Sequence, residues 1–487
     1  MRVQTMRMQT MRMQILINFW WFRLAGALAV ALAPSTVLAA GADLGQLSIA
    51  WSLPFVGILL SIALFPLLAP SAWHHHFGKI TTAWALSFML PFTLLFGPMA
   101  MGVNFTHALL AEYVPFILLL TALFTVSGGV FIRGNLHGSP GLNTAILAIG
   151  AVLASFMGTT GASMLLIRPL IRANDNRKHK AHVVVFFIFI VSNAGGSLTP
   201  LGDPPLFLGF LKGVDFFWTI KHILPETLFL VGGLLAVFYA IDWVTYHRRE
   251  EVLPFDPTPD DRQIGFDGAR NFLLLAAILA LVLMSGFWKS QVAFNVWGTE
   301  VGLPGLLRDV GLIAVIFLSL QVTPPKVHED NQFSWAPMVE VAILFAGIFI
   351  TIVPVIAMLK AGVNGPFGMV VKLVTNPDGT PNPAMYFWIT GLLSSFLDNA
   401  PTYLVFFNTA GGDPALLMTT YASTLAAISA GAVFMGANTY IGNAPNLMVK
   451  SIAEERGVAM PSFFGYMLWS GAILLPMFAI ITLIWFK

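Results

Sequence analysis

The chain contains 487 residues, of which 57% are hydrophobic and 10% are charged, and its mean hydropathy is +0.79. Because soluble domains carry about 25% charged residues, this composition predicts a polytopic protein of the lipid bilayer rather than a soluble one. The net charge of +2 does not indicate a nucleic-acid partner, and the absence of cysteine excludes disulfides, thiolate metal sites and a cysteine nucleophile.

The N-terminus has the pattern of a cleavable secretory signal. Three Arg residues occur in the first twelve positions, an apolar run covers 24–33, and small residues continue to Ala40. We therefore expect residues 1–40 to be a signal peptide, the mature N-terminus to be periplasmic and the protein to lie in the cell inner membrane. An uncleaved first membrane helix is the alternative, because apolar residues resume at Leu47.

Eight uninterrupted apolar runs are long enough to cross a bilayer as helices, which takes roughly 17 to 25 residues. These runs lie at about 50–70, 79–98, 113–132, 222–245, 271–287, 303–321, 335–358 and 462–485. Four further apolar stretches are interrupted by polar residues, Gly and Pro, at 142–171, 182–213, 386–409 and 415–452. We expect an all-α protein in which these four stretches form the functional region.

Basic residues indicate how the interrupted stretches lie in the membrane. Arg133 precedes the stretch 142–171, and Arg172, Arg177, Lys178 and Lys180 follow it. Since positive charges favour the cytoplasmic side, both ends of this stretch belong there. We therefore predict a re-entrant helical hairpin with its tip at 158–161. The same rule places the later group on the cytoplasmic side, at Arg248, Arg249, Arg262 and Arg270.

The second half of the chain repeats the first with opposite orientation. Each half is predicted to have five transmembrane helices, one of them broken, and one re-entrant hairpin. Matching residues stand 240 positions apart, as Gly196 and Gly436, Thr199 and Thr439, Gly202 and Gly442, Asp203 and Asn443, Pro205 and Pro445, and Ser155-Phe156 and Ser395-Phe396. We therefore divide the chain into a first inverted repeat at 41–250, a cytoplasmic linker at 251–270 and a second inverted repeat at 271–487.

The stretch 192–210, SNAGGSLTPLGDPPLFLGF, combines polar residues, glycines, prolines and a carboxylate inside an apolar run. A bilayer cannot satisfy free backbone groups or a charge, so such a segment is buried in protein or lines a wet cavity. We predict a helix that breaks near the membrane midplane, with Pro204 and Pro205 opening its second half, where a missing N–H costs nothing. Transporters build binding sites in this way.

Asp203 and Asp398 are the two carboxylates expected at membrane depth. Asp398 is the only charge between Pro383 and Gly412. An ionised group there costs at least about 2.5 to 3.5 kcal/mol on insertion scales, so each needs a partner, a proton or a cation. Each acid also precedes a proline that opens a half-helix, so the alternative is that it serves only as an N-cap. At the second position Asn399 could supply that cap instead.

Side chains that can bind ions surround the two acids. We expect the ion or substrate site to comprise Asp203, Asp398, Asn193, Thr199, Asn399, Asn438, Thr439, Asn443, Thr159 and Thr160, with Na⁺ held by Asp203 and Asp398. Amides, hydroxyls and carbonyls coordinate hard cations, whereas helix N-termini would equally bind an anion. The nearest base is Arg168, and the four breaks contain two acids and no base. The balance favours cations or protons.

At these motifs the chain resembles the ion transporter superfamily, which includes NhaD-type sodium/proton antiporters, arsenite permeases and citrate or dicarboxylate carriers. The segments SNAGGSLTPLGDPP and SSFLDNAP are similar to NhaD-type motifs, and GANTYIGNAPNLMV is similar to the second broken helix of the superfamily. The resemblance implies that Asp203 and Asp398 carry the ion. NhaD-type proteins tend to have an acidic pair in the first hairpin, where this chain has Gly158-Thr159-Thr160-Gly161, and a citrate-transport branch is at least as similar.

We expect a secondary active transporter that works by alternating access, most simply a Na⁺ (or Li⁺)/H⁺ antiporter. The alternative is a Na⁺- or H⁺-coupled carrier of citrate or a dicarboxylate. Its partners would be monovalent cations and protons, or a small carboxylate, with no resident cofactor, and a homodimer is left open. An intramembrane aspartyl protease would need Gly-x-Gly-Asp, but Pro200 takes the place of the first glycine, so we expect no enzyme.

Overall fold

The computed structural model describes residues 44–134, 136–248 and 264–487. The expected signal peptide at 1–40 and most of the expected linker, 251–263, lie outside the described residues, as do Arg249 and Arg262. Within the described ranges the protein is almost entirely helical, as the composition predicted.

The first part of the chain runs from α2 to α9. Its helices are α2 (Leu53–Leu68), α3 (Pro70–His107), a π-helical turn η3 (Ala108–Tyr113), α4 (Val114–Gly128), α5 (Pro140–Met157), α6 (Thr159–Ala173), α7 (Ala181–Ile190), the 3₁₀ turn η4 (Ala194–Leu198), α8 (Pro204–Leu211) and α9 (Trp218–Arg248), preceded by the short turns η1 (Leu44–Gln46) and η2 (Ile49–Ser52). Several of these helices begin or end at Gly or Pro, as at Pro70, Gly158 and Pro204, where backbone freedom or a missing N–H interrupts a helix.

The second part runs from α10 to α21. Its helices are α10 (Arg270–Phe287), α11 (Leu303–Val322), α12 (Pro325–Asp330), α13 (Ala336–Thr351), α14 (Val353–Lys360), η5 (Gly362–Asn364), α15 (Gly368–Leu373), α16 (Pro383–Phe396), α17 (Asn399–Thr409), α18 (Pro414–Met418), α19 (Ala422–Met435), η6 (Gly436–Asn438), α20 (Ala444–Glu455) and α21 (Phe463–Trp485). Most of these helices have a Pro in their first turn, where the missing N–H of proline costs no hydrogen bond.

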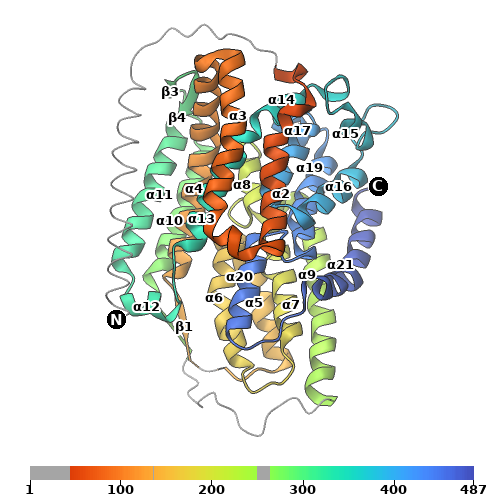
Figure 1. Cartoon of the computed structure of the whole chain (residues 1–487). Coiled ribbons are helices and arrows are strands. Elements are labelled where there is room, and N and C mark those ends of the chain that lie inside the picture. The colour runs from red at the N-terminus through yellow and green to blue at the C-terminus, as the bar shows by residue number, and fades with distance from the viewer. Residues whose placement is uncertain (1–43, 135, 249–263) are drawn as a thin grey trace.

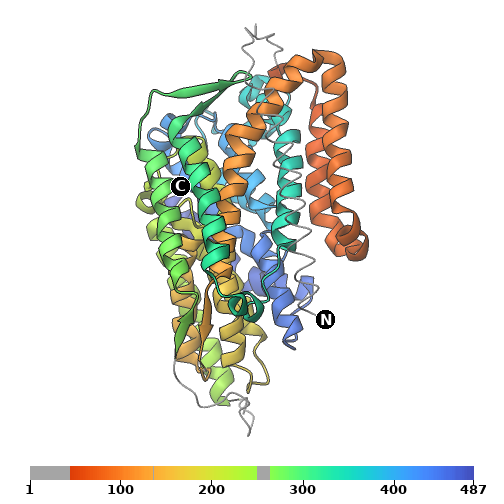
Figure 2. The ribbon, with the colours of Figure 1, turned by 90° about the vertical axis from the view of Figure 1, so that its left-hand side faces the viewer.

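Two small antiparallel ribbons connect the helices. Strand β1 (Phe131–Arg133) pairs with β2 (Gly265–Asp267), and β3 (Ala293–Val296) pairs with β4 (Thr299–Gly302). The first ribbon joins the end of α4 to the start of α10, and Figures 1 and 2 show it near the lower end of the molecule. The described end of the predicted linker, which contains β2, therefore lies at the same end of the molecule as the base of α6.

Eight helices of the described residues are long and apolar enough to cross a membrane, and nine if the bent pair α13 and α14 forms one span. The sequence predicted separate crossings at 79–98 and 113–132, but one apolar segment, Pro70–Gly128, covers both. At 1.5 Å per residue its 59 residues would extend far beyond a hydrocarbon core of about 30 Å. The chain turns at Gly97, whose φ of 87° suits glycine, so the next crossing begins near Pro98 rather than at 113.

The first hairpin is formed by α5 and α6. Gly158, with φ 80°, makes the sharp turn at the tip. The two outer ends meet, because the Gly138 N–H donates to the Ala173 carbonyl at 2.5 Å. This contact confirms that the stretch 142–171 enters and leaves on one side. The run His74–His76 lies in the first turns of α3, where all three residues are exposed.

A buried polar network holds the base of this hairpin. The Asp242 carboxylate of α9 accepts hydrogen bonds from Arg177 (Nη2–Oδ1, 2.7 Å), His182 (2.7 Å) and Asn143 (3.0 Å). Asn143 and Asn174 also exchange hydrogen bonds at 2.9 and 2.8 Å. Asp242 is 0% exposed. The network therefore ties the hairpin to both α7 and α9, and the sequence did not predict it.

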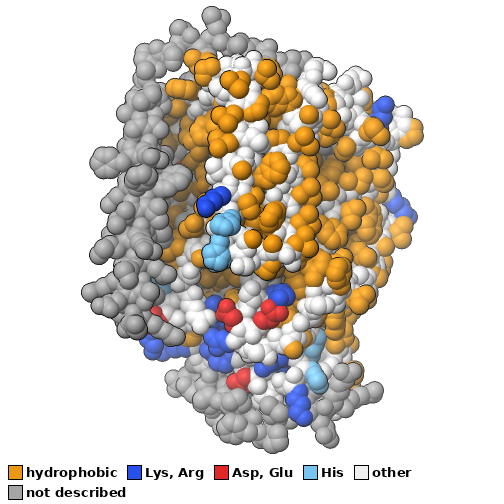
Figure 3. All heavy atoms as spheres, in the orientation of Figure 1, with side chains coloured by type: hydrophobic (Ala, Val, Ile, Leu, Met, Phe, Trp, Pro, Cys, Tyr) orange, Lys and Arg blue, Asp and Glu red, His pale blue; other side chains and the backbone are white. Residues whose placement is uncertain are grey.

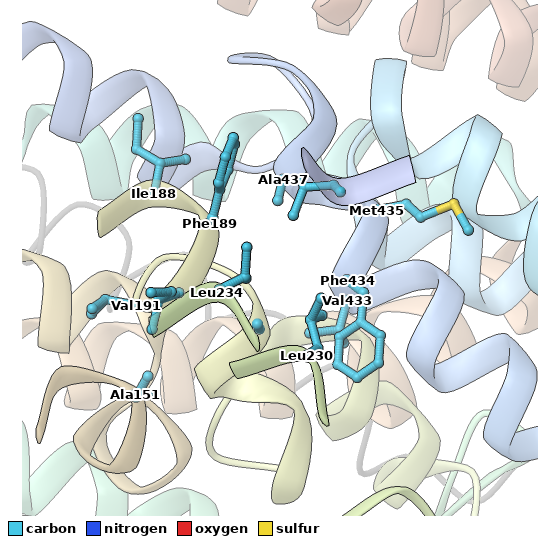
Figure 4. Close-up of a cluster of buried hydrophobic side chains, with 14 of the residues drawn as sticks. Ala151, Ile188, Phe189, Val191, Leu230, Leu234, Val433, Phe434, Met435 and Ala437 are labelled. Atoms are coloured by element: carbon cyan, nitrogen blue, oxygen red, sulfur yellow. The ribbon is translucent and has the colours of Figure 1, made fainter. Parts of the chain in front are cut away.

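The largest hydrophobic core surrounds α7. This helix is apolar on every face, and all the residues from His182 to Ile190 are buried. Figure 4 shows Ile188 and Phe189 from this helix with Leu230 and Leu234 of α9 and with Val433 to Ala437 of the second broken helix. The two broken helices thus pack around one shared core that brings their breaks together.

The outer surface divides into two kinds of region. In Figure 3 hydrophobic side chains cover most of the drawn face, whereas charged side chains gather toward its lower end. This is the end at which Arg172 donates to the carbonyls of Ile132 and Gly134. The predicted cytoplasmic basic groups that the structure describes therefore collect at one end of the molecule, which we call the basic end.

Candidate functional site

The site is built on two helix breaks. The first lies between α7 and α8 and the second between α19 and α20, and each contains a short 3₁₀ turn. Each loop folds back on itself at a glycine. A Cβ on Gly202 would stand 2.1 Å from the Gly196 carbonyl oxygen, and one on Gly442 would stand 2.5 Å from that of Gly436. No side chain fits at such distances, so the glycines fix the shape of both loops.

Equivalent hydrogen bonds tie each break to a hairpin, which is formed by α5 and α6 for the first break and by α16 and α17 for the second. The Thr199 hydroxyl donates to the Ser155 carbonyl, and the Thr439 hydroxyl donates to the Ser395 carbonyl. In return the Ser155 hydroxyl donates to the Gly195 carbonyl at 2.5 Å, and that of Ser395 to the Met435 carbonyl at 3.1 Å. Thr199 and Thr439 were expected to line the ion site. They instead brace the backbone behind it.

Asp203 is the centre of the site. It is 1% exposed, and its carboxylate accepts hydrogen bonds from Asn399 Nδ2 at 2.7 Å and from the Thr159 hydroxyl at 3.3 Å, with Asn443 Nδ2 at 3.5 Å. It stands at the N-cap position of α8 but makes no capping hydrogen bond. The capping alternative is therefore wrong for this residue, because its oxygens are turned toward the hairpin tips and the second break.

Asp398 and Asn399, both predicted in the site, contribute to it in different ways. Asp398 caps α17, accepting from the Ala400 N–H at 3.0 Å, and also lines the cavity described below. Asn399, which the sequence also offered as the cap, instead donates to Asp203. Asp398 is half-buried and Asn399 is fully buried. The residue that caps α17 and the residue that contacts Asp203 are therefore neighbours in the sequence. The spacing of residues in the sequence cannot show which of the two takes which role.

An amide bridge joins the two breaks. Asn193 Nδ2 donates to Asn446 Oδ1 at 2.8 Å, and Asn446 Nδ2 donates to the carbonyls of Gly436 and Thr439, each at 2.9 Å. Asn443 Nδ2 also donates to the Ser192 carbonyl at 3.2 Å. Asn446 was not among the predicted site residues. Its signal was its place one turn after Asn443, on the same helix face.

The acids line a cavity that contains about 870 Å³ of space free of protein atoms, including open solvent at its mouth. Its polar side chains are Thr159, Thr160, Asp203, Asp398 and Asn443. Most of the remaining surface is apolar, from α4, α13 and Met448 of α20. Among the described residues no Lys or Arg lines it. Five of the ten predicted residues therefore meet in one cavity.

The other five predicted residues lie behind the cavity wall. Asn399 touches Asp203 directly, Asn193 belongs to the amide bridge, and Thr199 and Thr439 brace the hairpins. Asn438 donates to the Ser395 hydroxyl at 2.9 Å. The structure thus brings all ten to the breaks and hairpin tips, but only half of them face open space.

Two amide oxygens remain unsatisfied beside the two breaks. In the described ranges no group of three or more His, Asp or Glu residues could hold a metal ion. The buried Oδ1 atoms of Asn399 and Asn438 have no hydrogen-bond partner among the described residues. Amide and carboxylate oxygens of this kind are ligands that Na⁺ accepts.

Helices broken around a buried acid, with two hairpin tips meeting at the breaks, define a multi-pass membrane transporter and not an enzyme. The protein family described as "Putative citrate transport" matches residues 44–486, and the chain belongs to this family. The match supports the resemblance to the ion transporter superfamily and its citrate-transport branch. A search of curated proteins finds no match.

Proposed function

We propose that this protein is a secondary active carrier that moves a citrate-like carboxylate together with Na⁺ or H⁺ by alternating access. The observation that carries the proposal is the position of Asp203, whose carboxylate contacts the first hairpin tip, the second hairpin tip and the second break at once. An ion bound there would alter contacts to all three elements. The family description supports the carboxylate as substrate.

Helix N-termini supply the attraction for an anion. The helices α6, α8, α17 and α20 each begin at a hairpin tip or a break, and Thr159, Pro204, Asp398 and Ala444 at these starts line the cavity. The positive end of a helix dipole favours negative charge. The four helix starts therefore bring partial positive charge to a cavity that, among its described lining residues, has no Lys or Arg.

The two acids make coupling necessary. A carboxylate substrate would share a low-dielectric cavity with Asp203 and Asp398, and like charges there repel one another unless cations or protons bind first. Asp203, with Asn399 and Asn443 beside it, is our proposed site for the coupling ion. Asp398, half-buried at the cavity wall, is the proposed second ion contact.

We also propose that the chain consists of two inverted repeats, at 41–250 and 271–487, with the basic end in the cytoplasm and the mature N-terminus in the periplasm of an inner membrane. Two matching hydrogen bonds support this division, from Thr199 to Ser155 and from Thr439 to Ser395. The two donors are 240 positions apart, and so are the two acceptors. Inverted repeats allow one half to rock against the other around a shared site, which is how alternating access arises.

A second candidate function is Na⁺ (or Li⁺)/H⁺ antiport, the one that the sequence alone favoured. The observation in its favour is that the cavity contains two carboxylates and, among its described lining residues, no base. In an antiporter Na⁺ and H⁺ would compete for the same acids, and no organic anion would be needed.

Purified protein in proteoliposomes separates the two functions. Labelled citrate uptake and internal pH are followed together while NaCl, LiCl or citrate is added outside. We expect citrate to accumulate only with an inward Na⁺ or H⁺ gradient. Sodium-evoked proton movement without any organic anion, together with no citrate accumulation, would overturn the carrier in favour of the antiporter.

A further inference from the structure

Arg168 of α6 is a buried cation to which the proposed mechanism gives no role. The residue is 9% exposed, yet its Nε and Nη1 atoms have no hydrogen-bond partner among the residues that the structure describes. Leaving buried N–H donors of a charged group without an acceptor is unfavourable. Glu455 acts on the guanidinium through its charge, but the two buried nitrogens still have no acceptor among the described residues and can donate to a bound anion.

Arg168 lies on the cavity side of α6. Thr160, Met164 and Arg168 are spaced by four residues and therefore share one helix face. Thr160 lines the cavity, and Met164 packs with Phe124 and Met338, two other residues of the cavity wall. At 1.5 Å per residue, Arg168 is about 12 Å beyond Thr160 along the helix axis, toward the basic end.

Helix α20 forms the other wall beside Arg168. The helices α6 and α20 are in contact, and Figure 1 shows them side by side. Both start at the cavity, and Met448 of α20 lines it. Farther along α20, the charged side chains that act on Arg168 are Glu455 and Arg456, which are both exposed. Arg168 therefore stands between the cavity and water.

We infer that Arg168 is an anion-docking residue on a route that runs between α6 and α20 from the basic end to the Asp203 cavity. Its guanidinium binds a carboxylate group of the substrate before the substrate meets Asp203, or as it leaves. Arg is well suited to this because it stays charged and presents several donors to a carboxylate. The inference rests on the proposed function for the identity of the anion, a di- or tricarboxylate.

A purely structural role is the competing explanation. Arg168 could stabilise the C-terminal end of α20, where a cation favours the negative end of the helix dipole. That role predicts a loss of thermal stability on substitution, equal effects on transport from both membrane sides and no protection of position 168 by citrate. Docking predicts effects confined to substrate presented at the basic end.

Because the chain has no cysteine, Arg168→Cys provides a unique thiol. In proteoliposomes this thiol is treated from the basic-end side with impermeant methanethiosulfonates, one with a trimethylammonium group and one with a sulfonate group. We expect both to react and citrate to slow the reaction about fivefold or more, whereas gluconate at equal ionic strength does not. The buried control Ser163→Cys, at 0% exposure, should stay unmodified.

Transport kinetics supply the second readout. Arg168→Gln should raise the KM for citrate at the basic end about tenfold, with the maximal rate changed less than about threefold, whereas Arg168→Lys should stay within about threefold of the wild type. The cationic adduct on Arg168→Cys should recover part of the lost affinity, and the anionic adduct should not. Arg456→Gln, which removes a nearby exposed charge, should change KM less than about twofold.

The outcomes separate docking from the proposed function. Citrate uptake by the wild-type protein tests the carrier alone. If the wild type takes up no citrate but citrate still protects Arg168→Cys, the carrier is wrong and the docking residue stands. If the wild type takes up citrate while citrate gives no protection and KM is unchanged in Arg168→Gln, the docking residue is wrong and the carrier stands.

Discussion

The two helix breaks share a backbone and differ in charge. In both, a threonine hydroxyl donates to a hairpin serine carbonyl, and one glycine lies against the carbonyl of another. At the position after the second glycine, the first break has Asp203 and the second has Asn443. Neither side chain caps its helix. The comparison teaches that a negative charge is not needed to form a helix break. We therefore attribute the carboxylate of the first break to the function of the site.

The largest expected effect comes from making the two breaks alike. Asp203→Asn should reduce cation-coupled transport about 100-fold or more, because an amide can hold neither a proton nor a negative charge. The protein should still fold, with a Tm change of less than about 3 °C, because the second break already accepts Asn. Flux in proteoliposomes and thermal unfolding in detergent measure the two quantities.

The exchange variant, Asp203→Asn with Asn443→Asp, is the matched control. Residues 203 and 443 are in contact, so the exchange moves the carboxylate from the first break to the second and keeps it in the cavity. Part of the coupled flux should therefore recover. Full coupled flux in Asp203→Asn alone would contradict our assignment and move the coupling ion to another residue.

The two hairpins provide the next comparison, because their bases are held differently. The first base contains the fully buried Asp242, paired with Arg177 and His182. Near the second base, Asp378 is exposed, and the hydroxyl and N–H of Thr380 hold its pKa below the usual value. Asp242→Ala should lower the free energy of unfolding by about 3–5 kcal/mol, since it removes the buried carboxylate that is paired with Arg177 and His182.

Asp378→Ala is the matched surface variant. Its effect on the free energy of unfolding should be within about 0.5 kcal/mol, as is usual for exposed positions. Both variants can be compared by thermal unfolding in the same detergent. Similar stabilities of the two variants would show that the buried network does not hold the first hairpin.

The smallest expected effect tests whether the two braces are equivalent. Thr199→Val and Thr439→Val each remove a buried hydroxyl while keeping the shape of the side chain. Each should cost about 1–3 kcal/mol of stability, because the Ser155 or Ser395 carbonyl loses its donor, and the two values should agree within about 1 kcal/mol. A large cost at only one position would contradict the proposed repeat.

Much of this architecture was predictable because membrane depth leaves few options for polar residues. Gly202, Asp203 and Pro204 inside an apolar run predicted a buried break, and Arg133 before the hairpin with Arg172 after it predicted that both hairpin ends lie on one side. These inferences depend on local composition and on the positions of charges. The predicted run 79–98 ends at the turn at Gly97, but the next crossing was predicted to start too late, at 113, because Asn104, His107 and Glu112 interrupt the apolar pattern.

The details of the site were less predictable because they depend on which way each side chain turns. Asp398 and Asn399 are both good N-caps, and only the fold decides that one caps α17 while the other donates to Asp203. The network around Asp242 joins residues up to 99 positions apart. No local pattern reports such a contact. The Thr199 hydroxyl was predicted from the sequence to be an ion ligand, but it donates a hydrogen bond to the backbone carbonyl of Ser155.

The shared hydrogen bonds of Asp203 have a thermodynamic consequence. Its carboxylate is held by Thr159 from one hairpin and Asn399 from the other, so a cation that displaces or strengthens these bonds changes the free energy of both elements. Linkage is reciprocal: the factor by which the cation raises the affinity for the carboxylate must equal the factor by which the carboxylate raises the affinity for the cation. Titrating either ligand at fixed levels of the other therefore yields a single coupling free energy.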